Sequence, residues 1–73
     1  MSETGDRTLA ALTREWQSTA QIASKVEPSR GVGRYTHTRE VYYHLSKEVR
    51  RGVAEMKVEH DAQGRSAFWR LRP

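Results

Sequence analysis

The absence of cysteine is the feature that most constrains how a chain of 73 residues can fold. Without cysteine the chain has no disulfide, no thiolate zinc site and no cysteine nucleophile. A chain this short buries only about 60% of the surface that it exposes when unfolded, so its core is thin. We therefore expect one small domain that folds by side-chain packing alone and has no room for a catalytic cleft between subdomains.

The charge balance of the chain is basic. Thirteen Lys and Arg residues against nine Asp and Glu give a formal net charge of +4, and ten of the 13 are Arg. Arg favours forked contacts to phosphates and guanines, so this balance suggests a polyanionic partner. No apolar run approaches the roughly 20 residues of a membrane span, and the polar N-terminus does not resemble a signal peptide. We therefore expect an intracellular, cytoplasmic protein with no membrane partner.

Apolar residues at helical spacing predict a first helix near the N-terminus. Leu9, Leu12 and Trp16 recur at this spacing and place the helix over about 6–15. Residues 1–5 precede this pattern and are expected to be flexible. After a short extended step at 16–18, a second helix is expected.

A capping box marks the start of the second helix. Ser18 and Gln21 are three residues apart, so each side chain can satisfy a free backbone N–H of the other. An apolar stripe follows at helical spacing, and Pro28 lies just past its end, where a helix often stops. Residues 27–37 are expected to form a loop.

The third helix is expected over about 38–51. Thr38 is its expected cap, with Thr36 as second choice, and Gly52 ends it. The apolar stripe of this helix predicts its buried face, which consists of Val41, Leu45 and Val49.

Alternating residues after Gly52 predict a two-stranded hairpin. The strands are expected over 53–60 and 66–72, joined by a turn at 61–64. Met56 and Val58 share one strand face, and Phe68 points away from Trp69. A hairpin alone is marginally stable in water, so its apolar face is expected to cover the helices.

The order helix, extended step, helix, loop, helix and hairpin over residues 6–72 resembles the winged helix-turn-helix family. Residues 18–26 resemble the second helix of that family, 39–53 its third helix leading into the wing, and 69–71 the last strand of the wing. The long loop at 27–37 departs from the family's usual tight turn.

This resemblance implies an α+β fold with three helices and a C-terminal two-stranded β-hairpin wing. It also implies a transcription regulator that binds double-stranded DNA, with the third helix in the major groove. Small stand-alone modules of this kind resemble regulators from phages and other mobile elements. Because one such module reads only a short site, a weak homodimer formed on DNA is also expected.

The candidate DNA-binding residues follow from the buried face of the third helix. The opposite side of this helix and its start carry Thr38, Arg39, Glu40, Tyr43, Lys47 and Arg50. Arg39 and Tyr43 are expected to meet base edges, and Lys47 and Arg50 to meet phosphates. Further contacts are expected from the loop, the wing tip and the start of the second helix: Arg30, Arg34, Tyr35, Thr36, His37, Gln63, Arg65, Ser18 and Thr19.

Other functions are less well supported by the sequence. His37, His44 and His60 form no recognisable triad with a Ser and an acid, so we expect no enzyme. Glu40 and His44 are four apart, a spacing that more often gives a surface pair than a metal site, and we expect no metal or cofactor. Two alternatives remain open: a protein-interaction module that grips an acidic partner with the same face, and a binder of left-handed or otherwise shape-marked nucleic acid.

Overall fold

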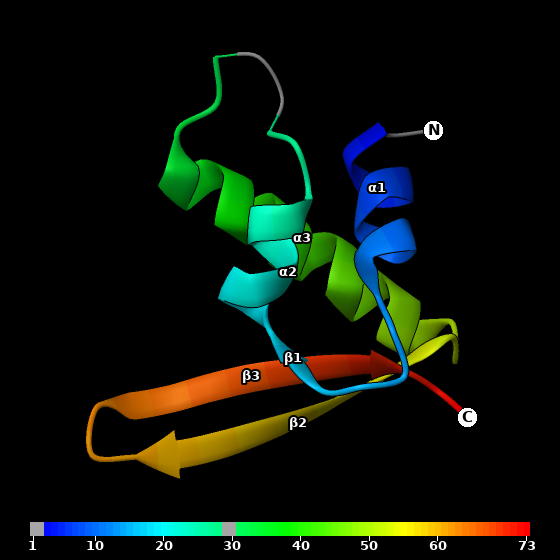
Figure 1. Ribbon diagram of the computed structural model, residues 1–73, viewed down its shortest axis with the longest axis vertical. Coiled ribbons are helices and arrows are strands. Elements are labelled where there is room, and N and C mark those ends of the chain that lie inside the picture. Colours follow the sequence, from blue (N-terminus) through cyan, green and yellow to red (C-terminus); the bar gives the residue numbers. More distant parts are fainter. Residues whose placement is uncertain (1–2, 29–30) are drawn as a thin grey trace.

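The computed structural model describes residues 3–28 and 31–73, which form three helices and three strands on an α+β plan. The elements are α1 (Glu3–Ala11), β1 (Gln17–Ser18), α2 (Thr19–Lys25), α3 (Arg34–Arg50), β2 (Ala54–Asp61) and β3 (Gly64–Leu71). The strands form one antiparallel sheet in the order β1-β3-β2. The helices lie on one face of this sheet, and the β2–β3 hairpin extends beyond them (Figure 1).

The sheet has three strands, which corrects the two-stranded hairpin predicted from the sequence. Gln17 and Ser18 were expected only to be extended, and they pair with Trp69 and Phe68 of β3. Two residues are too few for an alternating pattern to predict a strand. Their pairing depends on the open edge of β3, and it ties the α1–α2 connection to the sheet.

The first helix begins and ends earlier than predicted. Because α1 starts at Glu3, residues 3–5 of the predicted flexible segment are helical, while residues 1–2 lie outside the described residues. Its buried face contains two threonines, Thr4 and Thr8, and Thr8 Oγ1 donates a hydrogen bond of 2.7 Å to the Thr4 carbonyl. The helix ends at Ala11, so Trp16 lies beyond it and does not continue its apolar face.

The third helix also begins earlier, at Arg34, so the predicted loop at 27–37 is shorter than expected. Its N-cap is Gly33, in extended conformation and without a side-chain cap, which corrects the prediction of Thr38 or Thr36. Thr38 lies within the helix, where its Oγ1 donates to the Arg34 carbonyl at 3.0 Å. The other end agrees with the prediction, because Gly52 follows the helix with a φ of 80°.

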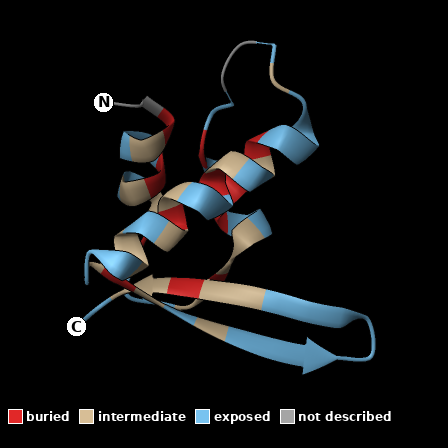
Figure 2. Ribbon diagram, turned by 180° about the vertical axis from the view of Figure 1, so that it is seen from behind, coloured by how far each residue is buried: buried red, intermediate tan, exposed pale blue. Residues whose placement is uncertain are grey.

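The core lies between the helices and the base of the sheet (Figure 2). Val41 and Leu45 are fully buried in it, and Val49 packs partly against it, so the predicted buried face of α3 is confirmed. Trp69 is also fully buried, and its indole N–H donates a hydrogen bond of 2.8 Å to Thr19 Oγ1. This bond joins the start of α2 to β3.

The hairpin has the predicted two strands and tight turn. Ala62 and Gln63 connect β2 to β3, the Gln63 N–H donates to Asp61 Oδ1 at 2.8 Å, and Gly64 has a φ of 125° that only glycine adopts without strain. The distal half of the hairpin is exposed (Figure 2). Among the described helices, none has the length and apolar character needed to span a membrane.

Candidate nucleic-acid interface

The solvent face of α3 carries the cations that the sequence assigned to it. Because Val41 and Leu45 point into the core, the residues on the opposite side of the helix turn outward. The exposed members of the predicted set are Arg39, Tyr43, Lys47 and Arg50. Glu40 lies beside them and is partly buried.

Two of these cations pack over aromatic rings one turn away. The Arg39 Cζ atom lies 5.9 Å from the centre of the Tyr35 ring, and the Lys47 Nζ atom lies 5.4 Å from the centre of the Tyr43 ring. Exposed cation–π contacts stabilise by about 0.5–1 kcal/mol. They hold the two cations close to the helix surface without neutralising their charge.

Charge pairing differs between the two sides of the molecule. Glu55 pairs with Arg70, and Glu59 with Lys57 at 3.0 Å, on the sheet face turned away from the helices. Within residues 3–28 and 31–73, no ion pair involves the cations of the α3 surface and the hairpin tip, which are Arg34, Arg39, Lys47, Arg50 and Arg65. These five cations therefore leave positive charge without an ion-pair partner on α3 and near the end of the hairpin, as Arg14, Lys25 and Arg72 do elsewhere in the described part of the chain.

A groove of about 770 Å³ runs between α3, the hairpin and the start of α2. Six of the candidate residues named from the sequence line it: Ser18, Thr19, Tyr35, Thr38, Arg39 and Arg65. Gln63 is exposed at the turn, whereas Glu40, Lys47 and Arg50 lie along α3 outside this lining. The structure thus brings the α3 N-terminal half and the hairpin together around one concave surface.

Two of these groove residues also have structural roles. Ser18 Oγ accepts from the Gln21 N–H at 3.1 Å, and the Ser18 N–H donates to Gln21 Oε1 at 2.8 Å, which confirms the predicted capping box. Thr19 Oγ1 accepts from the Trp69 indole. Both residues are half-buried, so the groove has a fixed edge at the start of α2.

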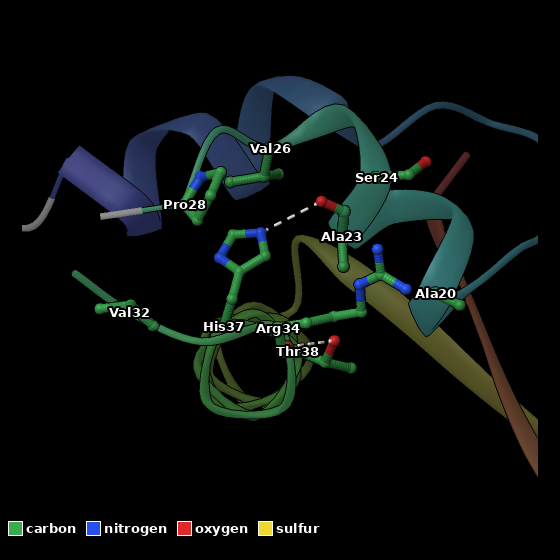
Figure 3. Close-up of a pocket in the computed structure, with 9 residues that line it drawn as sticks. All are labelled: Ala20, Ala23, Ser24, Val26, Pro28, Val32, Arg34, His37 and Thr38. Atoms are coloured by element: carbon green, nitrogen blue, oxygen red, sulfur yellow. Dashed lines mark hydrogen bonds between the residues drawn. The ribbon is translucent and has the colours of Figure 1, made fainter. Parts of the chain in front are cut away.

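His37 is not the exposed loop residue that the sequence predicted. It lies in the first turns of α3 and is 5% exposed, and its ring points toward α2, where Nε2 is 3.1 Å from the Ala23 carbonyl (Figure 3). Since a carbonyl only accepts, Nε2 carries the proton and donates. The predicted exposed loop position of His37 is therefore wrong, because its ring is buried against α2.

The other residues of the predicted loop have different positions. Arg34 and Thr36 are exposed in the first turn of α3, and Tyr35 there is 77% exposed. Arg34 also lines a cavity of about 510 Å³ between α2 and α3, together with His37 (Figure 3). Arg30, also a predicted contact, lies outside the described residues.

The sequence did not indicate that the hairpin has two partly exposed faces. Met56 and Val58, expected near the core, line the groove and remain exposed. On the opposite face, Trp16 is half-buried between Arg70 and Lys57, whose cationic groups lie 4.3 Å and 4.8 Å from its ring centre. The alternation of the strand predicted which residues share a face but not how far the helices extend over it.

Among the described residues, no group of three or more His, Asp or Glu side chains is placed to hold a metal ion. Comparisons of the chain with protein-family models, curated proteins and solved structures found no match. The features of this chain that bear on its function are therefore this surface and the order of the elements.

Proposed function

We propose that this protein is a winged helix-turn-helix regulator of transcription that binds double-stranded DNA in a sequence-specific manner. The order α1-β1-α2-α3-β2-β3, with the hairpin beside the third helix, supports this proposal. In this proposal α3 is the recognition helix and the β2–β3 hairpin is the wing.

The observation that carries the proposal is the row of unpaired cations on the solvent face of α3. This helix has 17 residues, so it is about 25 Å long. With its side chains it is about 10–12 Å wide, which matches the roughly 12 Å width of the major groove. Arg39, Lys47 and Arg50 stand on the side that would enter the groove, opposite the buried Val41 and Leu45.

Different cations have different roles in this proposal. Arg39 lies in the N-terminal half of α3 and offers a forked contact to guanine O6 and N7, with Tyr43 beside it on the base edges. Lys47 and Arg50 lie further along the helix and bind phosphates, which fix the position of the protein on the duplex. Arg65 near the hairpin turn reaches the adjacent backbone or minor groove.

Selection of bound sequences from a random duplex pool tests this function. We expect a clear sequence motif, and a symmetric motif would indicate that two copies bind together. With a labelled duplex that carries the motif, Arg39→Ala should weaken binding by about 1–3 kcal/mol and relax the preference at one base pair. Lys47→Ala should weaken binding to all sequences alike.

The control is Arg14→Ala, which removes the same charge from the α1–β1 connection, outside the proposed interface. Fluorescence anisotropy at low salt should give this variant the affinity of the unchanged protein. The proposal fails if the pool yields no motif, or if Arg39→Ala and Lys47→Ala both bind DNA as tightly as Arg14→Ala.

A further inference from the structure

The groove between α3 and the hairpin has an apolar floor that DNA binding does not explain. Four of the five large apolar or aromatic side chains exposed among the described residues line it: Tyr35 at 77% exposure, Tyr42 and Val58 at 45%, and Met56 at 41%. A gathering of exposed apolar side chains on a small protein indicates an interaction surface.

The apolar floor follows from the length of the hairpin. Ala54, Met56 and Val58 share the strand face turned toward the helices, because they lie opposite Leu71, Trp69 and Ala67 of β3. The helices bury Ala54 at the base of the hairpin but leave Met56 and Val58 exposed. The face is therefore apolar beyond the end of the core, where the helices cover Met56 and Val58 only in part.

The edges of the groove are cationic. Arg39 of α3 and Arg65 of β3 both line it, and no Asp or Glu is among the described residues that do so. Neither arginine forms an ion pair with a described residue. Phosphates would satisfy these arginines but would gain nothing from Met56 and Val58, which bury favourably only against apolar groups.

We propose that this groove binds a short segment of a partner protein that combines acidic side chains with two or three large apolar ones. The apolar side chains pack on Tyr42, Met56 and Val58, and the carboxylates bind Arg39 and Arg65 at the edges. The volume of about 770 Å³ lies within the range of pockets that hold a compact ligand.

Such a segment would compete with DNA, a point that depends on the function proposed above. Arg39 is assigned both to the base edge and to the edge of the groove, so it binds one ligand at a time. Occupation of the groove would therefore release the protein from its duplex. A partner protein that carries such a segment would thus regulate DNA binding by competing for Arg39.

Selection from a random 12-residue peptide library displayed on phage, with the full chain as target, tests the inference. We expect enriched sequences in which Asp or Glu alternates with Leu, Phe or Trp. Synthetic labelled copies of these peptides are then measured by fluorescence anisotropy. Met56→Gln and Val58→Thr should each weaken peptide binding about five- to tenfold, because each removes an apolar contact at the centre of the groove.

Two comparisons make this test specific. Glu59→Thr changes the neighbouring residue of β2, which points to the opposite face, and should bind the peptides as the unchanged protein does. Duplex binding should change less than twofold in Met56→Gln and Val58→Thr, whereas Arg39→Ala should weaken both peptide and duplex. Circular dichroism checks that each variant is folded.

The outcomes separate this inference from the DNA proposal. Enriched peptides that need Met56 and Val58, on a chain that binds no duplex, would support the groove and overturn the DNA function. The inference is overturned if no peptide is enriched, if the enriched peptides are basic, or if they bind Met56→Gln and Val58→Thr unchanged. It is also overturned if those two variants lose duplex binding to the same extent as peptide binding, because the groove would then belong to the DNA interface.

Discussion

His37 links α2 to α3 through a single side chain. Its ring is buried between the two helices, and its Nε2–H donates to the carbonyl of Ala23 in the last turn of α2. Its Nδ1 is buried without a hydrogen-bond partner among the described residues. The residue therefore contributes packing and one hydrogen bond, at the position where the chain re-enters a helix after the α2–α3 connection.

Replacing His37 by Ala should lower the free energy of unfolding by about 2–4 kcal/mol, because it opens a cavity and removes one of the two hydrogen bonds that the Ala23 carbonyl accepts, the other coming from the Val26 N–H. Urea denaturation followed by circular dichroism measures this loss. Arg39→Ala, on the exposed side of the same helix, should change the unfolding free energy by less than about 0.5 kcal/mol. Equal stabilities of the two variants would contradict the structural role of His37.

Thr19 and Trp69 form the only described side-chain hydrogen bond between α2 and β3. Thr19→Val keeps the shape of the side chain but leaves the buried indole N–H of Trp69 without an acceptor. We expect a loss of about 1–3 kcal/mol in the free energy of unfolding. The emission wavelength of Trp69 fluorescence should shift on this substitution. An unchanged free energy of unfolding would mean that water or another group replaces the Thr19 hydroxyl as acceptor.

At the scale of the elements, the α3–β2 connection determines where the hairpin leaves the helix. Gly52 has a φ of 80°, a conformation that residues with a Cβ rarely adopt. A Cβ at this position would meet only Arg72 Nη1, at 3.8 Å, so backbone conformation and not crowding selects glycine here. This turn brings β2 back along α3 and so positions one wall of the groove.

Gly52→Ala should therefore destabilise the fold by about 1 kcal/mol through backbone strain. Gly52→Asn should cost less, because Asn tolerates the left-handed region better than Ala. Thermal unfolding of the two variants side by side gives the order. Equal melting temperatures of the Ala and Asn variants would contradict backbone strain as the reason for glycine at position 52.

At the scale of the whole molecule, a thin core supports a surface rich in unpaired cations. A domain of 73 residues has a stability of about 4–11 kcal/mol, so the loss of about 2–5 kcal/mol expected for Leu45→Ala would leave it marginal or unfolded.

The cations of α3 and the hairpin tip repel one another in the free protein. A bound polyanion relieves this repulsion, and that relief should depend on salt.

DNA binding should accordingly weaken steeply as salt rises. If four of the unpaired cations, Arg34, Lys47, Arg50 and Arg65, each neutralise one phosphate while Arg39 contacts a base, log affinity against log salt should have a slope of about −3.6. Lys47→Ala should reduce the magnitude of the slope by about 1. A flat dependence from 50 mM to 200 mM salt would exclude phosphate binding by this surface.

The sequence by itself determined the elements whose signals are local. The capping box of Ser18 and Gln21, the stripe of Val41 and Leu45, and the hairpin turn before Gly64 each depend on neighbouring residues, and each appears as predicted. The exposed side of α3 followed from its buried stripe, because helical geometry fixes one when the other is known.

Only the tertiary structure decided the features that depend on distant partners. The strand at Gln17 needs the free edge of β3, and the early start of α3 accompanies the packing of His37 on α2. Met56 and Val58 are exposed because the hairpin extends past the helices. No local sequence pattern shows how much of a strand the helices will cover. Such contacts join residues far apart in the chain, so local sequence patterns cannot predict how much they stabilise the fold.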